Sequence, residues 1–200
     1  MLILAFDTAT DVATIALVRD GDVLGERSSR AVRVLDDANA LLADAGLGAD
    51  DLDAIVVGRG PGSYTGLRMG LITARTLAFS LGISVAGVPT LEALAAGSPG
   101  SVPVVDARRG EVFTLVESEP RCLRPEDVPV VVGATYVGDG AVRYRPVLAR
   151  AGAIVPPDDA EVHVPWARHH AALARDFDAP EALSPIYLRE PDAERALTKP

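Results

Sequence analysis

Short apolar runs separated by polar turns open the chain, and their pattern predicts three strands in meander order. Residues 2–6 form a continuous apolar run, which is typical of a strand buried on both faces of a sheet. Residues 12–18 are rich in β-branched side chains and predict a second strand. The turn Arg19-Asp20-Gly21-Asp22 then favours a hairpin, with the returning strand at residues 23–28.

Helical and strand patterns alternate through the rest of the first half. A helix ending near Gly46 is predicted from apolar residues at helical spacing, namely Val34, Leu35, Ala38, Leu41, Leu42 and Ala45. Residues 52–57 predict a strand that leads into a glycine-rich turn and then into a helix ending at about residue 81. A short strand at residues 84–86 and a helix opened by Pro89-Thr90 follow. This alternation indicates an α/β fold.

Small residues and structure breakers at residues 96–101 mark the best boundary within the chain. We therefore expect an N-terminal lobe at residues 1–98, which carries the glycine-rich turn. A smaller C-terminal lobe is expected at residues 99–200.

The opening pattern recurs directly after this boundary. The apolar run at residues 102–105 ends in Asp106, and a polar turn leads to a predicted strand at residues 112–116. Strand, terminal Asp, turn and returning strand occur in the same order at the N-terminus, where the Asp is Asp7. The recurrence suggests an internal duplication.

Weaker patterns fill the remainder of the second half. Strands are expected at residues 128–132 and 134–137, helices at 141–151 and 166–177, and an extended end at 186–189 that docks Ile186 and Leu188 on an apolar surface. Gly138-Asp139-Gly140 opens the first of these helices.

Composition restricts the class of protein. Of the 200 residues, 48% are hydrophobic and 24% are charged, which is enough for a packed core. The net charge of −9 argues against direct binding of nucleic acid, because phosphate contacts need a basic surface. Cys122 is the single cysteine, so an internal disulfide is excluded. The short apolar N-terminus is typical of a strand rather than a signal peptide, no apolar run is long enough for a membrane span, and we expect a cytoplasmic protein.

The glycine-rich segment at residues 58–68 is the strongest motif in the chain. A strand followed by such a turn and a helix start presents backbone N–H groups that favour an anion. A Walker A loop would end in Gly-Lys-Ser/Thr, whereas this segment ends in Gly66-Leu67-Arg68. The segment is therefore either an anion cradle or a tight turn that allows the helix to pack closely on the sheet.

The helix that follows carries a stripe of small and apolar residues. Gly66 and Gly70 lie four residues apart and share one face with Leu71. This smooth face suits either core packing or close contact with a partner helix. Arg68 and Arg75 lie seven residues apart near one face and are either solvated charges or contacts to the same partner.

Five motifs in a fixed order resemble the TsaB (YeaZ) family of bacterial tRNA-modification proteins. They are Phe6-Asp7-Thr8-Ala9-Thr10, residues 58–68, Asp106-Ala107-Arg108 with Gly110-Glu111-Val112, Val137-Gly138-Asp139-Gly140-Ala141, and Tyr187-Leu188-Arg189. The resemblance covers nearly the whole chain. It implies the actin-like (ASKHA) fold, with two ribonuclease-H-like lobes related by duplication.

The same resemblance implies a function in making threonylcarbamoyladenosine (t6A) in tRNA. The family is similar to TsaD, the subunit with the transferase site, and pairs with it, and the ATPase TsaE joins the pair. We expect a noncatalytic scaffold without a cofactor of its own, with ATP and metal in the partner subunits and tRNA reached only through the complex. No membrane contact is expected, and a homodimer of the isolated chain is left open. The family's basic His-Ser segment before the first helix is missing at residues 28–33, which affects the expected partner interface.

A second interpretation is an ATP-binding phosphotransferase or ATPase of the same fold. In actin-like ATPases, an Asp at the position of Asp7 orients metal-bound water near a nucleotide phosphate. The candidate nucleotide or anion contacts are Asp7, Thr8, Thr10, Asp106, Gly138 and Asp139. However, an Asp that ends a strand often only bonds backbone N–H groups of the turn that follows.

The histidines and the cysteine predict neither a metal site nor a nucleophile. TsaD relatives bind a metal through a His-x-x-x-His pair, whereas His163, His169 and His170 contain no pair four residues apart. We expect all three to lie at the surface. Cys122 is expected to be an ordinary thiol in a proline-flanked loop.

Overall fold

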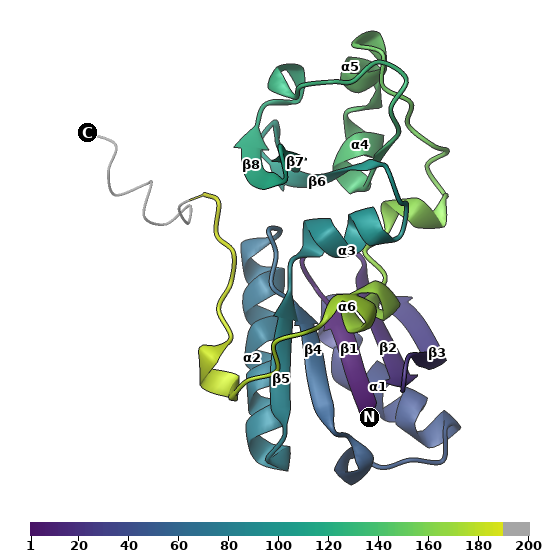
Figure 1. Ribbon diagram of the computed structural model, residues 1–200, viewed down its shortest axis with the longest axis vertical. Helices are drawn as coiled ribbons and strands as arrows, with labels where there is room; N and C mark the ends of the chain where they lie inside the picture. The colour runs from purple at the N-terminus through teal and green to yellow at the C-terminus, as the bar shows by residue number, and fades with distance from the viewer. Residues whose placement is uncertain (190–200) are drawn as a thin grey trace, which may run out of the picture.

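The computed structural model describes residues 1–189 as two lobes, each built on one sheet (Figure 1). The strands are β1 (Leu2–Asp7), β2 (Ala13–Arg19), β3 (Asp22–Ser29), β4 (Ala54–Gly58), β5 (Ser84–Val88), β6 (Val102–Arg108), β7 (Glu111–Val116), β8 (Glu119–Leu123) and β9 (Tyr136–Val137). The α-helices are α1 (Val34–Asp44), α2 (Tyr64–Leu81), α3 (Thr90–Ala96), α4 (Asp139–Arg143), α5 (Arg145–Arg150) and α6 (Ala167–Leu173). Short 3-10 helices are η1 (Ala31–Arg33), η2 (Ala49–Asp51), η3 (Pro125–Asp127), η4 (Glu161–His163) and η5 (Pro180–Ala182).

The first sheet has the order β3-β2-β1-β4-β5 and confirms the predicted meander. β1 pairs antiparallel with β2 and parallel with β4. Leu4 and Phe6 on one face pack into the core shared with α1 and α2, and Ala5 on the other face packs with α3 and α6. The continuous apolar run of β1 is therefore buried on both faces, as its pattern predicted.

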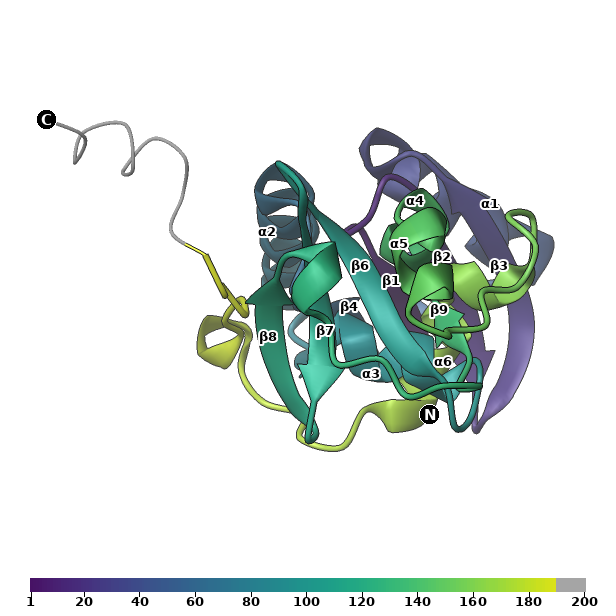
Figure 2. The same cartoon turned by 90° about the horizontal axis from the view of Figure 1, so that it is seen from above.

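The second sheet repeats this arrangement with the order β8-β7-β6-β9. β6 pairs antiparallel with β7 and parallel with β9, as β1 does with β2 and β4. In both lobes the first strand carries an Asp near its end, Asp7 in β1 and Asp106 in β6. The predicted duplication and the two-lobed α/β fold are confirmed, and Figure 2 shows the second sheet lying across the top of the first lobe.

The C-terminal part of the chain returns to the first lobe, which corrects the expected lobe at 99–200. α6 packs against β1, β2 and β4 (Figure 1), and Leu183 lies in the core under α1 and α2. The backbone at Asp178 pairs with Val85 at the edge of β5. Just before α6, the Thr14 hydroxyl donates a hydrogen bond to the carbonyl of Pro165 at 2.8 Å. The first lobe is therefore completed by residues from both ends of the described chain.

Two helices differ from their predicted extents. The helix expected at 141–151 is two helices, because Pro146 lacks an N–H and its ring would clash within a continuous helix. α6 ends at Leu173, and the Arg175 guanidinium donates to the Ala172 and Ala174 carbonyls beyond it. Among residues 1–189, no helix has both the length and the apolar character required to cross a bilayer.

Two strand predictions in the second lobe were wrong or incomplete. Residues 128–132 form no strand, because the Val131 N–H donates to the Tyr136 hydroxyl at 3.0 Å rather than to a neighbouring strand. Of the strand expected at residues 134–137, the second half, Tyr136–Val137, forms β9. The missed strand β8 contains Pro120 and no alternating apolar pattern, so its sequence carries little strand signal.

Candidate functional site

Asp7 ends β1 inside a buried polar cluster of the first lobe. Its Oδ1 accepts a hydrogen bond from the Ala9 N–H at 2.6 Å, and its Oδ2 accepts one from the Thr90 hydroxyl at 2.7 Å. His170 Nε2 lies 2.7 Å from the same Oδ2. The side chains of Asp7, Thr90 and His170 are all inaccessible to solvent. The turn-forming interpretation of Asp7 therefore describes one of its contacts, and His170 and Thr90 provide the others.

The charge of this cluster favours an ionised Asp7. Burial by itself raises the pKa of the carboxyl, because a charge is poorly solvated there. The attraction of the nearby His170 and the hydrogen bonds from Thr90 and Ala9 outweigh burial and hold the pKa of Asp7 below its ordinary value. Gly58 closes the remaining side, since a Cβ at this residue would lie 2.0 Å from Oδ2. The carboxylate is thus enclosed by its own chain.

Gly66 and Gly70 allow α2 to pack directly on the turn after β1. The Thr8 hydroxyl donates a hydrogen bond to the Gly66 carbonyl at 2.7 Å. A Cβ at Gly66 would lie 2.1 Å from the Thr8 carbonyl oxygen, and one at Gly70 would lie 2.3 Å from Thr8 Oγ1. The glycines and Leu71 are buried within the chain. This corrects their predicted place in a partner interface, because the smooth face is already covered.

Arg68 and Arg75 lie at the surface of α2 but contact the chain's own C-terminal segment. Arg68 Nε donates to the Tyr187 hydroxyl at 3.3 Å, and its guanidinium lies 4.2 Å from the ring centroid of Tyr64. Arg75 donates to the carbonyls of Leu183 and Glu181. These arginines hold the returning segment against α2, a contact that the sequence pattern did not indicate.

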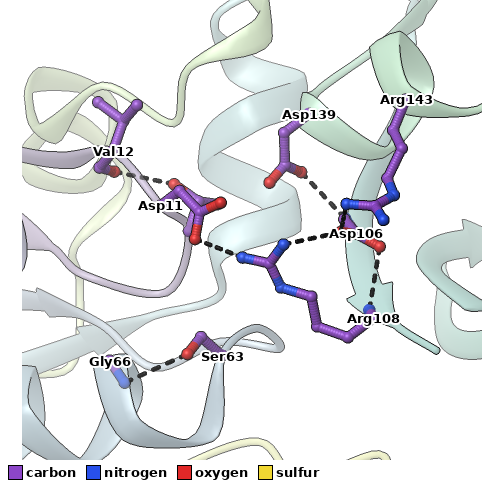
Figure 3. Close-up of polar contacts among 9 residues, drawn as sticks. Asp11, Val12, Ser63, Gly66, Asp106, Arg108, Asp139 and Arg143 are labelled. Carbon is purple, nitrogen blue, oxygen red and sulfur yellow. Dashed lines mark hydrogen bonds and ion pairs between the residues drawn. The ribbon is translucent and has the colours of Figure 1, made fainter.

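A cleft between the lobes contains the other predicted acids. Its cavity has a volume of about 320 Å³ and is lined by Thr10, Asp11, Val12, Asp106, Arg108, Asp139, Val142, Arg143, Asp158, His163, Val164 and Pro165. Figure 3 shows Asp11, Asp106, Arg108, Asp139 and Arg143 of this cleft, with Ser63 and Gly66 at the start of α2 nearby. Asp106 and Asp139 line the cavity, whereas Asp7 and Thr8 do not. The predicted nucleotide contacts therefore do not form one site, because Asp106 and Asp139 lie at the cleft and Asp7 and Thr8 lie away from it.

Asp106 is neutralised by arginines of its own lobe. Its Oδ2 lies 3.2 Å from Arg108 Nη1 and 3.2 Å from Arg143 Nη1 (Figure 3). Its backbone N–H donates to Asp139 Oδ1 at 2.9 Å. Burial first, and then the negative charges of Asp106 and Asp11, raise the pKa of Asp139 to about 6. Asp139 thus gains its proton closer to neutral pH than an ordinary carboxyl does, and Asp106 is paired with two guanidinium groups.

Gly138 and Thr10 have their polar groups engaged within the chain. The Gly138 N–H donates to His163 Nδ1 at 3.0 Å, and the Thr10 hydroxyl donates to the Val12 carbonyl at 2.8 Å. The amide of Gly138, a predicted nucleotide or anion contact, is therefore already hydrogen-bonded within the chain. Within residues 1–189, His, Cys, Asp and Glu side chains form no group of three that could hold a metal ion.

The prediction of three surface histidines was wrong for two of them. His163 is buried at the cleft, and His170 is buried against Asp7, whereas His169 is partly exposed. A signal for His170 was present in the sequence. Ala167, His170, Ala171 and Ala174 recur at helical spacing, and this alanine-rich stripe is the buried face of α6.

The outer surface of the first lobe exposes large apolar side chains. On α2, Ile72 is 61% exposed and Phe79 is 76% exposed, and their spacing of seven residues places them on one face. Val32 in η1 and Leu35 in α1 are also exposed, and η1 lies beside α2. We call these four residues the α1–α2 patch. Its helices cover the same face of the first sheet.

Known proteins resemble this chain in sequence and in fold. The family model of TsaD, tRNA N6-adenosine threonylcarbamoyltransferase, matches residues 21–127. An uncharacterised protein of Mycobacterium tuberculosis is 39% identical over 96% of this chain and 93% of its own. The tRNA threonylcarbamoyladenosine biosynthesis protein TsaB of Bacillus subtilis is 43% identical over 64% of this chain and 60% of its own. The solved structure of YeaZ from Pseudomonas aeruginosa is 27% identical, with a TM-score of 0.75 over 94% of this chain and 99% of that one.

Proposed function

Because the chain belongs to the TsaB (YeaZ) family, whose named members act in tRNA threonylcarbamoyladenosine biosynthesis, we propose that it is a noncatalytic subunit of that pathway. It binds a TsaD-type transferase subunit, and a TsaE-type ATPase joins the pair. Catalysis, ATP and metal then belong to the partners. tRNA meets the chain only within the complex, since a net charge of −9 opposes direct binding.

The α1–α2 patch is the observation that carries this proposal. Apolar side chains as exposed as Ile72 and Phe79, gathered on one helix face, are typical of a protein interface. The TsaD family model matches residues 21–127, a range that includes α1 and α2. Two subunits that share a fold can pair by packing the equivalent helices of each subunit against one another. A weak homodimer of the isolated chain through this patch follows from the same argument.

The state of the acids supports a noncatalytic role. Asp7 is enclosed by His170 and Thr90, and Asp106 is bound by two arginines of its own lobe. Metal-assisted phosphate chemistry needs carboxylates that are free to hold a cation or orient water. Here these carboxylates bind side chains of the same protein instead.

ATP binding or hydrolysis by the chain itself is a second candidate, favoured by the cleft cavity that Asp106 and Asp139 line. Calorimetry of the isolated chain with ATP and Mg²⁺ separates the two candidates. Binding accompanied by turnover would replace the accessory role with an enzymatic one, whereas neither heat nor turnover supports the accessory role.

The proposed function is tested by the t6A content of cellular tRNA. Depletion of the chain should lower t6A, and the wild-type chain should restore it. Phe79→Asp should fail to restore t6A, because it places a charge in the α1–α2 patch. Val132→Asp is the matched control, since Val132 is 80% exposed on the other lobe and should behave as wild type. Unchanged t6A after depletion would contradict the proposal.

A further inference from the structure

Arg108 occupies an unfavourable backbone conformation at the end of β6. Its φ is 63°, and those of Arg109 and Gly110 are 55° and 78°. The left-handed region suits Gly, Asn and Asp, whereas a long side chain there costs free energy. The β6–β7 pairing also shifts register between Asp106 and Arg108. Such a bulge changes the direction of the side chain that follows it.

The guanidinium of Arg108 joins the two lobes across the cleft. Nη2 forms an ion pair with Asp11, which lies in the β1–β2 turn of the first lobe. Nη1 lies 3.2 Å from Asp106 Oδ2, and the Arg108 N–H donates to Asp106 Oδ1 at 3.0 Å, both within the second lobe (Figure 3). The pKa of Arg108 lies above its ordinary value, first because Asp11 accepts its hydrogen bond.

Arg143 provides a comparison within the same cleft. Its Nη1 lies 3.2 Å from the same oxygen, Asp106 Oδ2, as Arg108 Nη1 does. Arg143 belongs to α4 and its pair with Asp106 stays within the second lobe. Both arginines therefore neutralise the Asp106 carboxylate, and Arg108 differs from Arg143 because it also forms an ion pair with Asp11.

We propose that Arg108 is a latch that holds the two lobes together across the cleft. The bulge and the left-handed turn aim the guanidinium at Asp11, while Asp106 holds its other nitrogen. Two lobes packed against each other can change their relative angle by hinge or shear motion. The latch adds to the buried contact of α3 with β6 and β7 and restricts the lobe angle further, which goes beyond the proposed binding of partners.

Distances between spin labels on the two lobes test the latch. Labels at Asn39→Cys in α1 and Arg150→Cys in α5, both exposed sites, are placed in a Cys122→Ser background. The full-length chain is measured by double electron–electron resonance. Arg108→Ala and Asp11→Asn should each raise the fraction outside the wild-type distance peak about twofold to fivefold, the range for an exposed ion pair. The double variant should show no larger effect than either single one.

Two controls keep the result decisive. Arg143→Ala removes the same charge from the cleft and should leave the distances unchanged. Arg108→Gly relieves the left-handed strain, so that it folds at least as well as wild type while losing the latch. Unchanged distances in Arg108→Gly and Asp11→Asn would overturn the proposal. If Arg143→Ala changed the distances as much as Arg108→Ala, the proposal would also be overturned. The change would then come from the unneutralised charge of Asp106 and not from the contact between Arg108 and Asp11.

Discussion

His170 Nε2 lies 2.7 Å from Asp7 Oδ2, and neither side chain is exposed to solvent. This contact ties α6, the last α-helix of the described chain, to the first strand. It fills the position at which the actin-like resemblance suggested a nucleotide contact. The pair completes the first lobe, and the proposed noncatalytic role predicts that it also keeps Asp7 from phosphate chemistry.

Replacement of His170 by alanine should strongly destabilise the fold. The substitution leaves the Asp7 carboxylate buried without its main partner, which costs about 3–5 kcal/mol in comparable buried pairs. Urea unfolding followed by circular dichroism measures this loss. His169→Ala is the matched control, because His169 is partly exposed and its loss should cost less than about 1 kcal/mol. Equal losses for the two variants would show that the Asp7 contact contributes little.

The raised pKa of Asp139 should make stability depend on pH. Between its ordinary pKa of 3.8 and about 6, the folded chain keeps a proton that the unfolded chain has lost. Stability should therefore fall as pH rises through this window and then level off, with a change of roughly 3 kcal/mol at most. Urea unfolding between pH 4 and pH 7 of wild type and Asp139→Asn measures it. The account is contradicted if both proteins show the same pH slope, since the amide side chain of the variant cannot titrate.

Gly66 should tolerate no side chain, because its neighbour is backbone. A Cβ would lie 2.1 Å from the Thr8 carbonyl oxygen, so Gly66→Ala should force α2 away from β1 and cost about 1–3 kcal/mol. Gly48→Ala is the control, since a Cβ there would meet Asp51 Oδ2 at 3.8 Å, an ordinary contact. Thermal unfolding compares the two variants. A Gly66→Ala protein as stable as Gly48→Ala, but unable to bind its partner, would restore the interface interpretation of Gly66.

Local patterns predicted much of the fold because they report which residues are buried in each element. The meander β1–β3 and its repetition in β6 and β7 follow from apolar runs that end in Asp7 and Asp106. Residues 128–132 show the limit of this reasoning. Their apolar run has the composition of a strand, but the structure provides no neighbouring strand for it.

The candidate site was less predictable because its contacts join distant segments. The sequence around Gly66 and Gly70 is the same whether these glycines face a partner protein or Thr8 of the same chain. The path of the β1–β2 turn places Thr8 against them. His170 reaches Asp7 only because the chain returns from the second lobe. Its alanine-rich stripe indicated a buried face but not which strand would lie beneath it.

The proposed binding of a TsaD-type subunit by the α1–α2 patch is tested most directly by the affinity of the complex. Isothermal titration of the full-length chain with the TsaD-type subunit of the same cell should give a defined complex. Phe79→Asp should weaken binding at least about tenfold, equivalent to about 1.4 kcal/mol, while Val132→Asp should bind as wild type does. The same affinity for all three proteins, or no complex with wild type, would contradict the account.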